Sequence, residues 1–251
     1  MKNQSWLTAR PIAHRGLHDL SRGIVENTPA AVSAAAAANY GIEIDVQVSA
    51  DGEAMVQHDD RLGRLVEGDE DVRTLGVAAL KARPFRAGTD RMATLGEICD
   101  LVNGRVPLLV ELKSRFDGDL SLPRRVAKVL AAYSGPVAVM SFDPAPIVAL
   151  RRLAPHLPHG ITAERRFAPG PDEVGPSGGW PRLRLDLLLH APSSRPGFLA
   201  YRLQDLATAP PRVARALGLP VLTWTVRSPA DRTAALARAD QVIFEGFLPE
   251  P

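Results

Sequence analysis

The sequence predicts a (β/α)8 barrel of the TIM type, built as one domain over residues 1–251. Short β-like runs alternate with helical runs along the chain, a pattern that predicts a parallel sheet with helices outside it. Eight alternations fit into 251 residues, which is a usual length for such a barrel. The composition, 45% hydrophobic and 23% charged, is ordinary for a chain that buries one sizeable core. An open, doubly wound parallel sheet is the competing fold.

Each predicted strand is a short apolar run bounded by turn-forming residues. In chain order the runs are Pro11–His14, Gly41–Val46, Val106–Lys113, Val137–Phe142, His159–Ala163, Leu185–His190, Val221–Val226 and Gln241–Phe244. Capping residues mark the start of several helices between them. An N-cap followed by a first-turn proline occurs at Thr28–Pro29, Asp143–Pro144 and Ser228–Pro229. Thr94 and Glu97 form a capping box.

Two long segments interrupt this alternation. Residues 59–92 form a polar and charged insertion between the second and third strands, and Arg165–Arg184 is a surface loop rich in Pro and Gly. Loops of this length in a compact domain are usually functional lids or disordered segments. We therefore expect the insertion to take part in function.

Charge and cysteine usage exclude several classes of protein. The 30 basic and 28 acidic side chains leave a net charge of +2, too small an excess for a nucleic-acid footprint. Cys99 is the single cysteine, so an intramolecular disulfide and a cysteine-based zinc site are both excluded. Met1–Arg10 lacks the apolar core of a secretory signal, and no run reaches the roughly 18 apolar residues of a spanning helix. We expect a cytoplasmic protein without stable membrane association.

The second and third predicted strands carry charged residues at alternating positions. Glu43 and Asp45 lie two residues apart, as do Glu111 and Lys113, so each pair points to one face of its strand. At inward barrel positions such charges are costly unless they are paired or bound to metal. Three carboxylates at one barrel mouth repel each other and need a cation. Because carboxylates are hard oxygen ligands, we expect one Mg²⁺ or Ca²⁺ there.

A β-hairpin is predicted after the second strand. Asp51–Gly52 separates two alternating runs, which is the strongest short hairpin signal and predicts a two-residue turn. Pairing Ala50 with Glu53 sets Asp45 opposite His58, so the hairpin returns an imidazole to the carboxylates. A register shift of one residue would turn that side chain to the other face.

These residues suit an attack on a charged ester. His14 ends the first strand and precedes Arg15, so a second imidazole and a guanidinium join His58 at the mouth. One imidazole can take a proton from the nucleophile while the other protonates the leaving oxygen. A cation, together with Arg15 and Lys113, can stabilise charge on phosphoryl oxygens. A phosphodiester is the substrate whose cleavage would use all of these groups.

The motifs resemble those of the glycerophosphodiester phosphodiesterases. The resemblance rests on an ordered set that spans nearly the whole chain: Ala13-His14-Arg15-Gly16, Glu26-Asn27-Thr28, Glu43-Ile44-Asp45-Val46, Asp51-Gly52, His58-Asp59, Glu111-Leu112-Lys113 and, less strictly, Trp224-Thr225-Val226. It implies metal-dependent hydrolysis of a small glycerophosphodiester to glycerol 3-phosphate and an alcohol. In related enzymes a neighbouring hydroxyl of the substrate can attack first and give a cyclic phosphate.

The resemblance also implies roles for the matching residues. The general acid and base would be His14 and His58, the metal ligands Glu43, Asp45 and Glu111, and the groups near the phosphate Arg15 and Lys113. Lys113 could instead serve only to neutralise Glu111. Trp224 could fill the barrel or form a wall against the glycerol. We expect Glu26 and Asn27 to support the site by fixing the loop after His14.

Several positions depart from the family's pattern. Arg227 stands where Asn is usual, Arg238-Ala239-Asp240 replaces Gly-Val-Asp, and Glu245-Gly246 replaces Thr-Asp. We expect these positions around the substrate rim, where they affect the alcohol accepted and leave the metal and imidazole chemistry intact. His190 ends a predicted strand and is a weaker candidate for the site. His18, His156 and His159 are assigned to the surface or to loops.

Two other functions stay open. Lysophospholipase-D-like cleavage of a single-chain lipid would need an apolar groove, to which the sequence could contribute Leu62, Leu65, Val66, Phe85 and Phe198. A catalytically silent, phosphodiester-binding barrel would have no need of an acid and a base. For the hydrolase, the insertion at 59–92 is expected to be a lid that selects the alcohol group.

Overall fold

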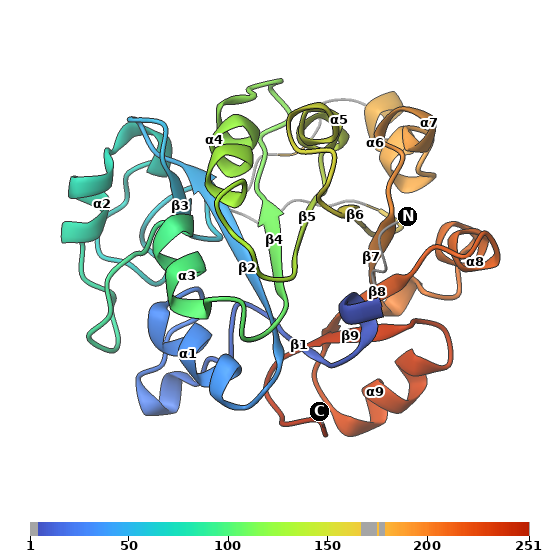
Figure 1. The fold of residues 1–251 in the computed structure, drawn as a ribbon, viewed down its shortest axis with the longest axis horizontal. Coiled ribbons are helices and arrows are strands. Elements are labelled where there is room, and N and C mark those ends of the chain that lie inside the picture. The colour runs from blue at the N-terminus through green and yellow to red at the C-terminus, as the bar shows by residue number, and fades with distance from the viewer. Residues whose placement is uncertain (1–4, 167–174, 176–178, 251) are drawn as a thin grey trace.

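The computed structural model describes residues 5–166, 175 and 179–250, and its centre is a closed parallel barrel (Figure 1). The barrel strands are β1 (Ile12–Ala13), β2 (Gly41–Val48), β4 (Leu108–Leu112), β5 (Val137–Ser141), β6 (His159–Ala163), β7 (Phe198–Arg202), β8 (Val221–Val226) and β9 (Gln241–Phe244). Neighbouring barrel strands are parallel, and β1 pairs with both β2 and β9 and so closes the ring. The predicted (β/α)8 fold is confirmed, and the open sheet is excluded.

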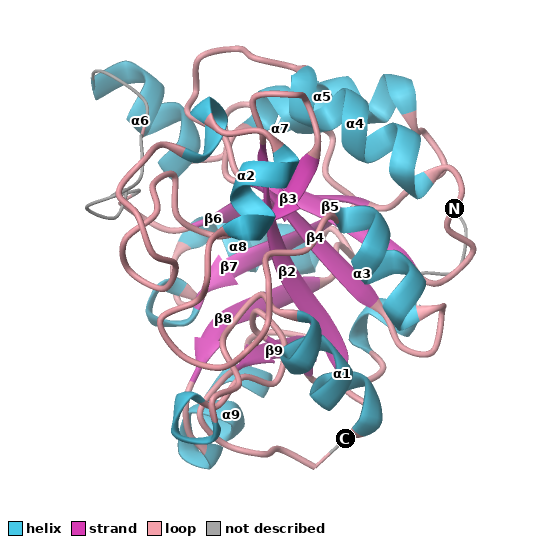
Figure 2. Ribbon diagram, turned by 90° about the vertical axis from the view of Figure 1, so that its left-hand side faces the viewer, coloured by secondary structure: helices cyan, strands magenta, loops and turns pink. Residues whose placement is uncertain are grey.

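Helices surround the barrel (Figure 2). They are α1 (Pro29–Ala37), α2 (Val77–Ala82), α3 (Leu95–Val102), α4 (Ser121–Leu130), α5 (Pro144–Leu153), α6 (Gly179–Asp186), α7 (Ala191–Ser194), α8 (Ala209–Ala216) and α9 (Pro229–Leu236). The predicted caps are confirmed, because Thr28, Asp143 and Ser228 each accept a backbone hydrogen bond from the helix that follows. Within the described residues, no helix has the length and apolarity needed to cross a membrane.

Alternate residues of the barrel strands face two different apolar cores. Outward residues such as Ile44 and Val110 pack with residues of the surrounding helices. Inward residues such as Leu109 and Phe198 fill the barrel, and Leu7 of the 3₁₀ turn η1 (Ser5–Thr8) joins this inner core. The apolar filling therefore occupies the amino end of the barrel, and the carboxyl end is left for polar side chains.

The predicted strand Leu185–His190 is wrong. α6 ends at Asp186, Leu188 has a φ of 52°, and the sixth barrel strand is β7. Periodicity alone cannot assign a short leucine-rich run to helix or strand, whereas Phe198–Arg202 contains aromatic residues that favour a pleated surface. The predicted loop Arg165–Arg184 lies partly outside the described residues, and its end belongs to α6.

The hairpin after β2 is confirmed, but its register differs from the predicted one. β3 (Ala54–Val56) pairs antiparallel with β2, and Val46 lies opposite Val56. The Ser49 N–H donates to the Glu53 carbonyl over 2.9 Å, and Gly52 has a φ of 81°. The connection is therefore a three-residue loop with a left-handed glycine rather than a two-residue turn.

This shift of one residue changes how His58 reaches the site. The Gln57 N–H, rather than a group of His58, donates to the Asp45 carbonyl at 3.1 Å. The expected pairing of Asp45 with His58 is wrong. Because β3 ends at Val56, strand alternation no longer fixes the direction of His58, and its side chain still lines the pocket at the barrel mouth.

The insertion at 59–92 has an apolar core of its own. The core side chains come from the insertion and two flanking segments: Val25, Met55, Leu62, Val66, Val72, Leu80, Phe85 and Met92. α2 lies beside β3 at the edge of the molecule (Figure 1). Of the insertion residues, the one found lining the mouth pocket is Asp60. The insertion therefore flanks the mouth of the barrel.

Gly160 leaves room for an aromatic ring in the barrel interior. It pairs with Phe198 across β6 and β7, and a Cβ on Gly160 would lie 2.2 Å from Phe198 Cε2. Phe198 is fully buried, so its ring cannot swing into solvent. Any side chain at position 160 must displace a packed ring.

We expect Gly160→Ala to lower the free energy of unfolding by about 1–3 kcal/mol through overpacking. Urea titration followed by circular dichroism measures the change. Gly96→Ala is the matched control, because a Cβ on Gly96 in α3 would meet Thr94 Oγ1 at an ordinary 3.8 Å. The control should keep or raise stability, since alanine restricts the unfolded chain. Equal urea midpoints for Gly160→Ala and the wild type would contradict this description of the packing.

Candidate active site

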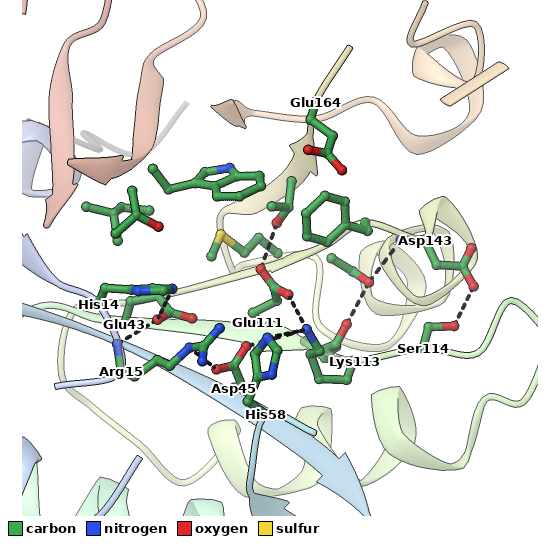
Figure 3. A pocket seen from close by; sticks show the side chains of 18 of the residues that line it. His14, Arg15, Glu43, Asp45, His58, Glu111, Lys113, Ser114, Asp143 and Glu164 are labelled. Atoms are coloured by element: carbon green, nitrogen blue, oxygen red, sulfur yellow. Dashed lines mark hydrogen bonds and ion pairs between the residues drawn. The ribbon is translucent and has the colours of Figure 1, made fainter. Parts of the chain in front are cut away.

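Three buried carboxylates lie together at the mouth of the barrel (Figure 3). Asp45 and Glu111 are paired across β2 and β4, and Glu43 lies two residues earlier on β2. Each side chain offers an oxygen, and these oxygens lie within 4.8 Å of one another. The strand alternation read from the sequence thus brings all three carboxylates to one point, which we call the carboxylate triad.

Crowding and burial give the members of the triad opposite tendencies to ionise. Burial, followed by the charges of Asp45 and Glu111, raises the pKa of Glu43 well above its usual value. Burial also opposes the ionisation of Asp45, but the electrostatic influence of His58, Arg15 and Lys113 outweighs it and lowers the Asp45 pKa. Glu43 therefore tends to hold a proton unless a further positive charge enters the triad.

Arg15 reaches the triad from the turn after β1. Arg15 and Gly16 have φ values of 56° and 79°, and a Cβ on Gly16 would lie 2.8 Å from the backbone of Ala31, so only glycine fits there. The turn directs the Arg15 N–H to the Glu43 carboxylate at 2.9 Å. Its side-chain Nε lies 3.3 Å from Asp45 Oδ2. One residue thus gives two cationic or donor contacts to the triad.

Glu26 and Asn27 contact these residues from behind the pocket lining. Glu26 Oε1 accepts a hydrogen bond from the Arg15 guanidinium at 2.6 Å. Asn27 donates to the Asp45 carboxylate at 2.9 Å and accepts from the Asp45 N–H at 3.1 Å. Both residues are therefore placed to hold the side chains of Arg15 and Asp45 in position.

His14 follows β1 and lies between two carboxylates. Its Nδ1 is 2.6 Å from Glu245 Oε2, and its Nε2 is 4.0 Å from Glu43 Oε2. Burial lowers the pKa of His14, although the hydrogen bond with Glu245 opposes that shift. Glu245 therefore contacts a site histidine directly, and the expectation that it affects only the rim is wrong. The closed barrel was a signal for this contact, because its first and last strands must be neighbours.

His58 approaches the triad from the hairpin. Its Nδ1 lies 2.8 Å from Asp59 Oδ1, and its Nε2 lies 3.2 Å from Lys113 Nζ. Lys113 Nζ is also 3.4 Å from Glu111 and 3.9 Å from Asp45. Since Lys113 both contacts Glu111 and lines the pocket, the two roles considered for it are compatible.

Arg64 is absent from the predicted site, yet it joins the partners of both Arg15 and His58. Its Nε donates to Asp59 Oδ2 at 2.7 Å, and its Nη2 donates to Glu26 Oε1 at 2.7 Å. Burial opposes the ionisation of Asp59, but hydrogen bonds from His58 and Arg64 lower its pKa to about 2. No spacing in the sequence reveals this contact, because the path of the insertion alone brings Arg64 to Glu26.

The triad forms the floor of a pocket of about 290 Å³, lined by all eight residues predicted for catalysis, metal binding or substrate binding. Phe142 and Trp224 form an edge-to-face pair in its wall, with ring centroids 5.6 Å apart. Trp224 also packs against the inner core and donates to the Ala200 carbonyl at 3.0 Å. It is therefore both barrel filler and pocket wall. Ser114, Asp143 and Glu164 add polar groups to the lining.

Several expectations about the surroundings are wrong. The residues considered for a lipid groove lie in apolar cores: Leu62, Leu65, Val66 and Phe85 in the insertion, and Phe198 in the barrel.

Arg238–Asp240 precedes β9 and so lies at the amino end of the barrel, away from the substrate rim. His159 is buried in β6. His190 follows α6 instead of ending a strand, and it lines a separate small hollow.

The triad fits a metal ion by its donors and by its charge. Its three ligands are carboxylate oxygens, which suit hard cations. Arg15 and Lys113 contact the triad, and their two positive charges against three negative ones leave one net negative charge. Burial and repulsion disfavour this excess, as the raised pKa of Glu43 indicates. A cation held by the three carboxylates would remove it.

The sequence matches the model of the glycerophosphoryl diester phosphodiesterase family over residues 14–247. A glycerophosphodiester phosphodiesterase from Caldanaerobacter subterraneus is 31% identical over 162 residues, which are 60% of this chain and 65% of that protein. A relative from Bacillus subtilis is 28% identical over 167 residues, 62% of this chain and 66% of its own length. Each match thus spans slightly less than two thirds of the curated relative.

Solved structures share the fold. A phosphodiesterase from Oleispira antarctica, in complex with the product sn-glycerol-3-phosphate, has a TM-score of 0.76 and 21% identity, with 95% of this chain and 94% of that one covered. A glycerophosphodiester phosphodiesterase from Thermotoga maritima has a TM-score of 0.67 and 22% identity, with 93% and 92% covered. Since the family match runs from His14 through the last barrel strand, this chain belongs to the glycerophosphoryl diester phosphodiesterase family.

Proposed function

We propose that this protein hydrolyses glycerophosphodiesters to glycerol 3-phosphate and an alcohol, with His14 and His58 as general acid and base. The observation that carries the proposal is that both imidazoles line one pocket with a buried carboxylate triad. The family match supports the substrate class. The burial of the residues considered for a lipid groove favours a small diester over a single-chain lipid.

We infer that Glu43, Asp45 and Glu111 hold one divalent cation, Mg²⁺ or Ca²⁺. With all three carboxylates ionised, the triad, Arg15 and Lys113 together carry one net negative charge, so a divalent cation would leave one net positive charge. That charge complements the single negative charge of a phosphodiester. When bound, the cation would draw electron density from the phosphoryl group and so make phosphorus easier to attack.

The side chains of the pocket can carry the remaining chemistry. Arg15 and Lys113 border the triad and can hold phosphoryl oxygens. One imidazole takes the proton of a hydroxyl nucleophile as its oxygen bonds to phosphorus, and the other gives a proton to the leaving oxygen as its bond to phosphorus breaks. If a hydroxyl of the substrate attacks first, a second round with water opens the cyclic phosphate. Whether water attacks directly or opens a cyclic phosphate in a second step, the complete reaction adds one water and releases one alcohol.

A direct assay tests the proposal. Purified protein with Mg²⁺ or Ca²⁺ and glycerophosphocholine should release choline and glycerol 3-phosphate in equal amounts, measured by enzymatic choline detection and ³¹P NMR. Turnover of lysophosphatidylcholine alone would favour lysolipid cleavage. Binding without turnover, unchanged in His14→Ala, would favour a silent binding barrel. Either of these outcomes would refute the proposed hydrolysis.

We expect His14→Ala and His58→Ala each to lower kcat by about 10²–10⁴-fold, because each removes one of the two proton-transfer groups. Steady-state kinetics on glycerophosphocholine measure the loss, and circular dichroism checks that the fold is kept. His156→Ala is the matched control, because His156 is exposed and does not line the pocket. A histidine variant that keeps more than a tenth of wild-type kcat has no proton-transfer role.

Removal of the cation should abolish turnover, and either Mg²⁺ or Ca²⁺ should restore it. We expect Glu111→Gln to weaken binding of the restoring ion by at least about tenfold, because it removes one charged ligand from the triad. Isothermal titration calorimetry measures the affinity and the number of sites. Glu67→Gln is the control, because it removes an exposed carboxylate of the insertion that is not part of the triad. Full activity in excess chelator would contradict the metal assignment.

Arg64→Ala should lower kcat by about 10–100-fold, the usual cost of removing a group that orients functional side chains. Without its guanidinium, Asp59 and Glu26 lose the bridge that positions His58 and Arg15. Arg64→Lys should recover little, because an ammonium cannot reproduce the planar fork. Arg91→Ala, an exposed arginine of the insertion, is the control. Wild-type kinetics in Arg64→Ala would show that this bridge has no part in the reaction.

A further inference from the structure

Two departures from the family's pattern, Arg227 and Glu245, contact each other, and Glu245 contacts His14. Glu245 Oε2 lies 2.6 Å from His14 Nδ1. Glu245 Oε1 lies 2.8 Å from Arg227 Nε and 2.7 Å from Arg227 Nη2. The two oxygens of one carboxylate therefore bind different partners, and the three residues form a series that ends at a site imidazole.

Strand pairing fixes this series. Ala13 of β1 lies opposite Phe244 of β9, and the His14 N–H donates to the Phe244 carbonyl at 2.9 Å. Residues 14 and 245, which follow these partners, must therefore meet. The Glu245 N–H donates to the carbonyl of Val226 at 3.1 Å, which brings the next residue, Arg227, alongside. Three adjacent strand ends supply the three members.

The chemistry of this contact fixes the proton on His14. An ionised carboxylate only accepts hydrogen bonds, so Nδ1 must donate. Burial opposes the ionisation of Glu245, but its hydrogen bond with His14, the neighbouring His18 and the charge of Arg227 prevail and lower its pKa. His18 Nε2 lies 3.8 Å from the same oxygen, beyond hydrogen-bond distance. With Nδ1 committed to Glu245, the ring nitrogen left for a substrate is Nε2, on the side of Glu43.

We propose that Glu245 is a positioning residue that keeps a proton on His14 Nδ1 and so presents Nε2 to the phosphodiester, while Arg227 holds Glu245 in that orientation. This inference rests on the proposed hydrolysis and adds to it the nitrogen through which His14 exchanges its proton. It holds whether His14 is the acid or the base, because both roles use the nitrogen that faces the pocket. Glu245 itself does not line the pocket.

A purely structural role makes a different prediction. If Glu245 only fastened β9 to β1, its loss would lower stability and leave the position of the His14 proton unchanged in the folded protein. The tautomer of His14 therefore separates the two roles. Long-range ¹H–¹⁵N spectra report which imidazole nitrogen carries the proton, and His14→Ala identifies the signal.

We expect the wild type at about pH 8, where a histidine of ordinary pKa is neutral, to show a protonated Nδ1 and an unprotonated Nε2. Glu245→Ala should populate the tautomer with the proton on Nε2. Its kcat on glycerophosphocholine should fall about tenfold or more, with KM and cation affinity within about threefold of wild type. Arg227→Ala should lower kcat less, because the contact of Glu245 with His14 remains. Glu67→Gln controls for the loss of one negative charge.

Glu245→Gln keeps the test decisive should Glu245→Ala fail to fold, because the amide has the shape of the carboxylate. Its oxygen can accept from Nδ1–H and its nitrogen can donate to bare Nδ1, so both tautomers should appear and kcat should be intermediate. An unchanged tautomer in folded Glu245→Ala or Glu245→Gln would overturn the inference. So would a kcat of Glu245→Ala within about threefold of wild type. The spectra need no substrate. A wild type inactive on every diester would therefore refute the hydrolysis, while the tautomer result would still show whether Glu245 orients His14.

Discussion

Repulsion among Glu43, Asp45 and Glu111 is the constraint around which the mouth of the barrel is built. Parallel pairing of Asp45 with Glu111 forces like charges together in a buried place, and neighbouring strands and loops bring donors and positive charges to them, among them Arg15, Asn27 and Lys113. This explains two strained backbone positions. Arg15 and Asn27 have φ values of 56° and 57°, and from these conformations they donate to Glu43 and Asp45, respectively. At these two positions the strained backbone thus serves the electrostatics of the triad.

The insertion is attached to the side of the barrel by ion pairs. Its own apolar core makes it a firm platform, and its ion pairs attach it to the loops after β1 and β4 and, through Lys81 and Glu97, to α3. Arg64 joins it to Glu26 in the loop after β1. Arg115, just after β4, contacts Asp71 of the insertion at 2.6 Å. Because His14 follows β1 and Glu111 lies on β4, these ion pairs connect the two sides of the mouth through the insertion.

Local periodicity was enough to predict the barrel and the triad, because alternation along β2 and β4 and the closure of the ring are properties of short segments repeated in order. The errors lie where distant segments decide. The Leu185–His190 run has no period that separates strand from helix, and only the completed ring shows that Phe198–Arg202 fills the sixth place. The hairpin register depends on one extra loop residue at the left-handed Gly52. Glu245 and Arg64 contact their partners because the fold brings distant segments together. No residue spacing along the chain predicts these contacts.

The meeting of β1 and β9 has a consequence for the order in which the barrel can close during biosynthesis. β1 is only two residues long, and its neighbour β9 is made last of all the barrel strands. The segments that supply the acidic cluster emerge from the ribosome long before residues 241–245 do. The residues of the triad are therefore synthesised before the carboxylate that contacts His14 Nδ1. The ring can close, and this contact can form, only after β9 has been synthesised.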